Sequence, residues 1–194
     1  MKRVCVFAGS KAGGAPLYRE AAAALGQLLA GKGIGLVYGA GRNGLMGAVA
    51  DAALSAGGKV IGVIPDSLMD IEPPHEGVTE LRIVKSMHAR KALMARLADG
   101  FIALPGGLGT IEETMEMITW AQLGYHAKPV GLLNAGGYFE GLLAFLRHAS
   151  AEGFVQPENL EIFRAEAGPA ALLEAMARYA PPPHVQRRRE IEEA

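Results

Sequence analysis

Three glycine-rich segments have the residue types that bind phosphate groups. They are Gly9-Ser10-Lys11, Gly39 to Gly44, and Pro105 to Thr110, and each follows a short apolar run. Glycine lets backbone amides approach an anion closely, and a helix that starts at such a loop adds unpaired N–H groups and a positive dipole end. Thr110 is expected to cap that helix or to donate its hydroxyl to a phosphate. The segments predict a phosphate-binding site, and the alternative is a set of tight turns without a ligand.

The segment from Gly39 to Gly44 also matches the G-x-G-x-x-G pattern of dinucleotide-binding proteins. It follows the second expected strand instead of the first, and Pro65, not an acidic residue, ends the next strand. No glycine-rich segment ends in the Lys-Ser/Thr pair of a triphosphate-binding loop. A nicotinamide-dependent oxidoreductase and a triphosphate hydrolase are therefore disfavoured.

Two charged residues are predicted to point toward the protein interior. On a helix over 87–98, Arg90 falls inside the apolar arc, whereas Lys91 and Arg96 fall outside it. On a helix over 110–123, Glu113 falls between apolar residues, whereas Glu112 and Glu116 face the other way. An inward charge needs an anionic or cationic partner, so Arg90 and Glu113 form either a buried ion pair or part of a site.

A carboxylate and a guanidinium beside a phosphate loop suit cleavage of a glycosidic bond. When a base leaves ribose, positive charge develops on the sugar, and a nearby carboxylate stabilises that charge. Glu113 can also orient or deprotonate the attacking water. Arg90 can hold the phosphate or the ribose, or stabilise the leaving base, and the sequence leaves these roles open.

The elements that would position these residues alternate along the chain. Strands are expected at residues 3–8, 34–38, 59–64, 81–84, 101–104, 129–133 and 161–164, and helices at 16–30, 45–56, 87–98, 110–123, 138–148 and 169–178. This alternation, with nearly all-apolar strands, predicts an α/β fold with a doubly wound parallel sheet. Ligands then bind at the carboxyl ends of the strands, where the glycine-rich segments lie. Residues 1–180 are expected to form a single domain and 181–194 a tail, and the long connection 65–79 is expected to be functional.

Composition narrows the function classes further. The chain has 194 residues, a net charge of −1 and a single cysteine, Cys5, within an apolar run. The charge argues against a nucleic-acid-binding protein, and the cysteine count excludes a disulfide within the chain and a multi-cysteine metal site. No apolar run is long enough for a membrane span or a secretory signal, so a cytoplasmic protein is expected.

Two motifs together resemble the paired signature of the Lonely guy (LOG) family, which was long mislabelled as lysine decarboxylases. They are Ser86-Met87-His88-Ala89-Arg90-Lys91 and Pro105-Gly106-Gly107-Leu108-Gly109-Thr110-Ile111-Glu112-Glu113. The resemblance covers residues 2–180 and implies a Rossmann-like homodimer. It also implies hydrolysis of an N6-modified AMP to the free base and ribose 5-phosphate, with some activity on AMP and no metal or redox cofactor.

The resemblance assigns roles by motif position. Arg90 and Glu113 match the catalytic pair, in agreement with the helical wheels, whereas Glu72 and Thr119 rest on the resemblance alone. With the glycine-rich segments, the predicted substrate-binding residues are Ser10, Gly39, Gly41, Glu72, Arg90, Lys91, Gly106, Gly107, Leu108, Gly109, Thr110, Ile111, Glu112, Glu113 and Thr119. Two residues depart from the pattern: Ala40 stands where a glycine is usual, and Lys11 where a serine is common.

Several functions remain as alternatives. One is an AMP nucleosidase of purine salvage, for which cytokinin nucleotides are incidental substrates. Another is a non-catalytic carrier of a nucleotide or of the molybdenum cofactor, which the presence of both Arg90 and Glu113 disfavours. A decarboxylase would need a pyridoxal phosphate site with a Schiff-base lysine, and only scattered lysines are present.

Overall fold

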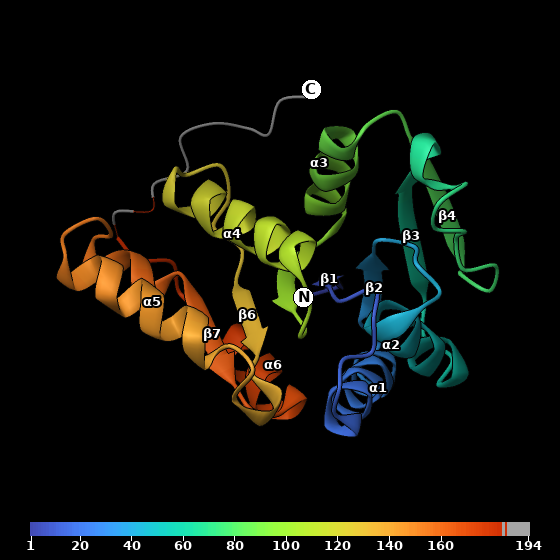
Figure 1. Cartoon of the computed structure of the whole chain (residues 1–194), viewed down its shortest axis with the longest axis horizontal. Helices are drawn as coiled ribbons and strands as arrows, with labels where there is room; N and C mark the ends of the chain where they lie inside the picture. The colour runs from blue at the N-terminus through green and yellow to red at the C-terminus, as the bar shows by residue number, and fades with distance from the viewer. Residues whose placement is uncertain (184, 186–194) are drawn as a thin grey trace.

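The strands form one parallel sheet at the centre of the molecule. The computed structural model describes residues 1–183 and 185, which fold as a single domain (Figure 1). All neighbouring strands are parallel, in the order β4-β3-β2-β1-β5-β6-β7. Their bounds are β1 Arg3–Phe7, β2 Gly35–Tyr38, β3 Val60–Pro65, β4 Glu80–Val84, β5 Gly100–Ala103, β6 Val130–Leu133 and β7 Phe163–Glu166.

Helices cover both faces of this sheet. They are α1 Pro16–Gly31, α2 Gly44–Ser55, α3 Met87–Leu97, α4 Leu108–Gln122, α5 Glu140–Ala151 and α6 Pro169–Ala177. Side chains of α1, α2 and α6 share one apolar core with the sheet, and those of α3, α4 and α5 share the other. Figure 1 shows the first group below the sheet and α3 and α4 above it. Because helices cover both faces, the five central strands are largely buried and nearly all apolar, as the sequence predicts. The edge strands β4 and β7 are partly exposed and contain charged residues.

The strand order reverses between β1 and β5. The chain leaves β1 for α1 on one face of the sheet and leaves β5 for α4 on the other. The loops after these strands therefore diverge and leave a crevice at their carboxyl ends. Rossmann-like sheets bind ligands at this position, and two of the three glycine-rich segments border it.

The predicted alternation is confirmed, and three elements begin two residues away from their predicted starts, whereas the other starts agree to within one residue. The last strand is expected at 161–164 but spans Phe163–Glu166, because Pro157–Glu161 forms a 3₁₀ helix first. The helix expected at 138–148 spans Glu140–Ala151, since Gly136 and Gly137 adopt positive φ and turn the chain before it. The helix expected from Thr110 starts at Leu108. Most of the predicted tail, including the arginines at 187–189, lies outside the described residues.

Among the described residues, no helix is both long and apolar enough to cross a membrane.

Candidate active site

The three glycine-rich loops pack against one another at the carboxyl ends of β1, β2 and β5. The amide of Gly9 donates to the Pro105 carbonyl at 3.1 Å. A Cβ on Gly44 would lie 2.3 Å from the carbonyl carbon of Ser10, and a Cβ on Gly106 would lie 2.8 Å from the Gly9 nitrogen. These approaches require glycine, because any larger residue would force the loops apart.

The two helices that start at these loops differ in what their first amides can bind. At the start of α2, the amides of Leu45 and Met46 donate to the Gly9 carbonyl, at 2.9 and 3.3 Å. At the start of α4, the N-cap residue is Gly107, which gives no side-chain cap, and the first turn has no acidic residue. A Cβ on Gly107 or Gly109 would meet no atom within 4 Å. An anion therefore fits at α4 and not at α2, where a dinucleotide would need it.

The helix-cap role considered for Thr110 is wrong. Thr110 is buried in the first turn of α4, and its carbonyl accepts a hydrogen bond from the Thr114 hydroxyl at 2.6 Å. Its neighbours differ, since Leu108 is 91% exposed whereas Ile111 packs against the core. The helix starts two residues earlier than expected because Gly107 takes the extended N-cap conformation.

Arg90 lies at the carboxyl end of β2, and one of its buried hydrogen-bond donors has no partner. The Ser86 hydroxyl accepts the Ala89 amide at 3.1 Å, which caps α3 one turn before Arg90. Arg90 is 6% exposed, and its Nη2 donates to the Gly39 carbonyl at 3.0 Å. A Cβ on Gly39 would lie 1.9 Å from that nitrogen. The Nε atom of Arg90 is buried without a hydrogen-bond partner, so a substrate oxygen could satisfy it.

Glu113 is a carboxyl group whose environment opposes ionisation. Burial raises its pKa from 4.5 to about 7, although the charge of Arg90 acts in the opposite direction. Burial also raises the pKa of the Cys5 thiol in β1, and the charge of Glu113 acts in the same direction whereas that of Arg90 acts in the opposite one. Among the described residues, no ion pair joins Arg90 to Glu113. The alternative that Arg90 and Glu113 serve only as a buried ion pair is therefore not supported. A carboxyl group with this pKa is suited to exchange protons near neutrality.

Lys91 lies outside the apolar arc of α3, as the helical wheel predicts, but it is not exposed. Lys91 is 8% exposed, and its Nζ lies 2.5 Å from Glu112 Oε1 and 3.1 Å from Glu116 Oε1. Burial disfavours its charge, but the hydrogen bonds to the two carboxylates outweigh this and raise its pKa. The helical wheel does not predict this burial because it considers α3 alone, and the carboxylates that hold Lys91 come from α4. Lys91 thus joins α3 to α4 and fixes the helices that carry Arg90 and Glu113.

The segment between β3 and β4 folds back over the loop after β2. The amide of His75 donates to the Ala40 carbonyl at 2.8 Å, and Pro74 pairs with Gly41. A Cβ on Gly41 would lie 2.6 Å from Glu72 Oε1, so the Glu72 carboxylate reaches the glycine-rich loops. Ala40, at the position where the resemblance expects glycine, has a φ of 64°, a conformation that favours glycine.

Thr119 is the predicted site residue that the structure does not bring to the loops. It is exposed on α4, eleven positions after Leu108, which corresponds to about 16 Å along a helix. Lys11, the other departure from the family pattern, is exposed in the loop after β1.

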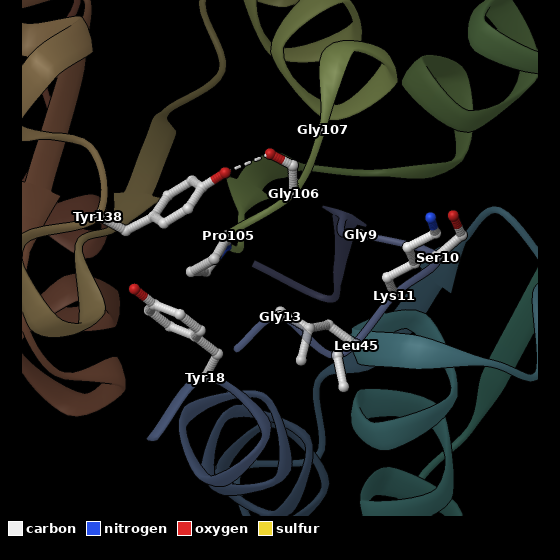
Figure 2. A pocket seen from close by; sticks show the side chains of 11 residues that line it. Gly9, Ser10, Lys11, Gly13, Tyr18, Leu45, Pro105, Gly106, Gly107 and Tyr138 are labelled. Atoms are coloured by element: carbon white, nitrogen blue, oxygen red, sulfur yellow. Dashed lines mark hydrogen bonds between the residues drawn. The ribbon is translucent and has the colours of Figure 1, made fainter. Parts of the chain in front are cut away.

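A pocket of about 400 Å³ adjoins the loops at the crevice between β1 and β5. Figure 2 shows its wall, to which Tyr18 of α1 and Tyr138 contribute their rings. Neither tyrosine belongs to a motif of the sequence. The available signal was the position of Gly136-Gly137-Tyr138, just after the carboxyl end of β6. In the described part of the chain, no group of three or more His, Cys, Asp or Glu side chains is arranged to hold a metal ion.

Sequence comparison identifies the relatives of this chain. Residues 46–176 match the family model described as "possible lysine decarboxylase". The chain is 52% identical, over 93% of its length and 79% of the relative's, to a probable cytokinin riboside 5′-monophosphate phosphoribohydrolase of Oryza sativa subsp. japonica, LOGL9. It is 51% identical to the cytokinin riboside 5′-monophosphate phosphoribohydrolase LOG7 of Arabidopsis thaliana, over 93% of this chain and 83% of that protein.

Solved structures with the same fold are more distant in sequence. The molybdenum cofactor carrier protein of Chlamydomonas reinhardtii is 23% identical with a TM-score of 0.69, over 91% of this chain and 96% of its own. The molybdenum cofactor binding protein of Rippkaea orientalis is 24% identical with a TM-score of 0.68, over the same shares of the two chains. At these identities the likeness shows the fold and says nothing about a ligand.

Proposed function

This chain belongs to the LOG family, and from that premise we propose that it hydrolyses N6-modified adenosine 5′-monophosphates to the free base and ribose 5-phosphate. The proposal rests on the sequence identity to relatives that are named for this activity. This identity is 51–52% over 93% of the chain. Both motifs of the family signature lie within the matched residues. Activity on AMP itself is part of the proposal.

The geometry of the loops supports a monophosphate substrate. The uncapped start of α4 and the open space at Gly107 and Gly109 offer backbone amides to one phosphate group. The start of α2 is already occupied by the Gly9 carbonyl, which leaves no second amide cradle for a pyrophosphate there. The substrate is therefore held by its 5′-phosphate, with its ribose toward α3 and α4.

The chemical step needs a group that favours positive charge on the sugar. As the bond between C1′ and the base nitrogen breaks, the oxygen of a water molecule bonds to C1′ and the base leaves with a proton. The Glu113 carboxylate stabilises the developing charge and accepts one proton of the water. The departing base takes up one proton in exchange, so the hydrolysis consumes one water and no net proton. Arg90, with its unpartnered Nε, binds the ribose or the leaving base. Glu72 reaches the same loops and can bind a ribose hydroxyl.

We test the proposal by incubating the protein with AMP and with isopentenyladenosine monophosphate and separating the released base by chromatography. The modified nucleotide is expected to release base faster than AMP. Glu113→Gln is expected to stay folded and to lose at least ~100-fold in turnover, the usual contribution of a positioned acid–base group.

Each of the other outcomes would indicate a different function or a different role of Glu113. Release from AMP alone would indicate an AMP nucleosidase. Nucleotide binding without release would indicate a carrier, and full activity of Glu113→Gln would remove Glu113 from the chemical step.

The proposal also includes a cytoplasmic homodimer. Its support is the family membership and the exposed apolar residues Leu108 and Leu123 at the two ends of α4, which are 91% and 53% exposed. A second copy that covers α4 would lie near Thr119, the site residue that the single chain leaves away from the loops.

A further inference from the structure

Tyr138 lies beside the phosphate loop and holds one of its carbonyls. Its hydroxyl donates to the Gly106 carbonyl oxygen at 2.5 Å (Figure 2). Gly106 is the residue before the α4 N-cap, Gly107, so this contact acts directly on the start of the helix. No motif contains Tyr138, and it is 32 residues away from Gly106 in the sequence.

The position of this hydroxyl is fixed by aromatic packing and by a buried anchor. The Tyr138 ring is edge-on to Tyr18, with centroids 5.5 Å apart, and to Phe139, at 5.1 Å. Phe139 is 1% exposed, and its amide donates to Asn134 Oδ1 at 2.7 Å. Because its ring is restrained on two sides, Tyr138 loses little conformational freedom when it makes the hydrogen bond.

The hydrogen bond determines the direction of the next amide. In a trans peptide the carbonyl of one residue and the N–H of the next point in opposite directions. With the Gly106 carbonyl directed at Tyr138, the Gly107 N–H points away from Tyr138. Figure 2 shows Tyr138 on one side of Gly106 and Ser10 of the neighbouring loop on the other.

Gly106 packs closely against Gly9 and Thr110, but the space beside Gly107, on the helix side of this peptide, is open. Gly106 and Gly107 have the greatest backbone freedom of any residues, and a Cβ on Gly107 would contact nothing within 4 Å. Without a partner for the carbonyl, the peptide plane could rotate and turn the amide out of the anion site. Binding of an anion would then have to order the loop, at a cost in affinity.

We propose that Tyr138 is a positioning residue which, by holding the Gly106 carbonyl, directs the Gly107 amide at the 5′-phosphate of the substrate. The inference rests on the proposed function, because it names what holds the phosphate at the site of that reaction. Tyr138 does not touch the reacting atoms and acts through the backbone of the loop.

The test is Tyr138→Phe, which removes the hydroxyl and keeps the ring. Dissociation constants of AMP and adenosine are measured by calorimetry with Glu113→Gln as the parent, so that turnover does not interfere. Loss of one hydrogen bond should weaken AMP binding by roughly three- to tenfold. Adenosine binding should change by less than about twofold on the same scale, because adenosine has no phosphate. In the active enzyme, the KM for isopentenyladenosine monophosphate should rise with kcat nearly unchanged.

Tyr125→Phe is the matched control. Tyr125 packs against Trp120 beyond the far end of α4, so its substitution should leave AMP affinity unchanged. Equal weakening of AMP and adenosine by Tyr138→Phe would indicate a general structural role and overturn the proposal, as would unchanged AMP binding. If wild-type protein binds AMP but releases no base, the proposed hydrolysis fails while the AMP–adenosine comparison still decides the role of Tyr138. If wild-type protein does not bind AMP, both proposals are overturned.

Discussion

At the scale of single residues, the ionisation of Glu113 should control the rate. Because burial places its pKa at about 7, the carboxylate form is depleted as the pH falls below neutrality. We expect kcat/KM to fall about tenfold per pH unit below pH 7, because this ratio reports groups of the free enzyme. The measurement is the initial rate of base release at saturating and limiting substrate between pH 5 and about pH 9.

The substrate phosphate also titrates, near pH 6 in phosphate monoesters, and could produce a similar limb in the profile. Glu112→Gln separates the two groups, because the negative charge of Glu112 raises the pKa of Glu113. The variant should move the limb to lower pH. A limb that stays in place would assign the titration to the substrate and not to Glu113.

At the same scale, the sequence predicted the direction of Arg90 but not the burial of Lys91. A helical wheel describes one helix against one apolar face, and that was sufficient for Arg90, which packs toward the end of β2. The carboxylates that hold Lys91 come from α4, and no pattern within residues 87–98 carries that information. Tyr138 was missed for a related reason, because its hydrogen bond depends on a loop that only the fold brings near.

At the scale of elements, the loop after β2 and strand β3 are packed to their limit. Ala40 has a left-handed φ of 64°, and a Cβ on Gly62 in β3 would lie 2.9 Å from the Ala40 Cβ. Gly62→Ala should therefore lower the free energy of unfolding by roughly 1–3 kcal/mol, as overpacking does. In the Ala40→Gly background the clashing methyl is absent, so the same substitution should cost about half as much or less.

Urea denaturation of the four proteins in this double-mutant cycle gives the coupling free energy. Additive effects of the two substitutions would mean that the strand and the loop move apart freely. A coupling free energy between the two substitutions would show that β3 shapes the site through the loop after β2. In this loop Gly39, which lies beside Arg90, and Gly41, which lies beside Glu72, flank Ala40. The alternation of apolar runs predicted β2 and β3, but the conformation of Ala40 between them depends on how β3 packs beside it.

At the scale of the whole molecule, two buried groups should give the stability opposite dependences on pH. His126 is 4% exposed at the connection from α4 to β6, and burial lowers its pKa from 6.5 to about 4. The amide of Lys128 donates to its Nδ1 at 3.1 Å, so its Nε2 carries the hydrogen and donates to the Met117 carbonyl at 2.9 Å. The neutral ring is the form that the fold accommodates.

The two signs follow from proton binding. The unfolded chain binds a proton at His126 more readily than the folded chain does, so His126 stabilises the fold above pH 6.5 and this is lost as the pH falls toward 4. Glu113 affects the stability in the opposite direction, because its raised pKa makes the folded chain bind the proton more readily than the unfolded chain does. Its contribution is present below pH 4.5 and is lost as the pH rises through about 7.

Between pH 4.5 and 6.5 the two contributions therefore oppose each other, each with a slope of up to about 1.4 kcal/mol per pH unit. In the wild-type protein these slopes largely cancel. Glu113→Gln leaves His126 alone, so the free energy of unfolding should rise with pH in this range. His126→Gln leaves Glu113 alone, so in this variant the free energy of unfolding should fall with pH.

Urea denaturation at four pH values measures both slopes. If the two variants showed the same slope as the wild type, neither group would be buried in the protonation state described. If only one variant showed its expected slope, the group that it retains would be buried as stated. The other group, in the active site or in the α4–β6 connection, would not be.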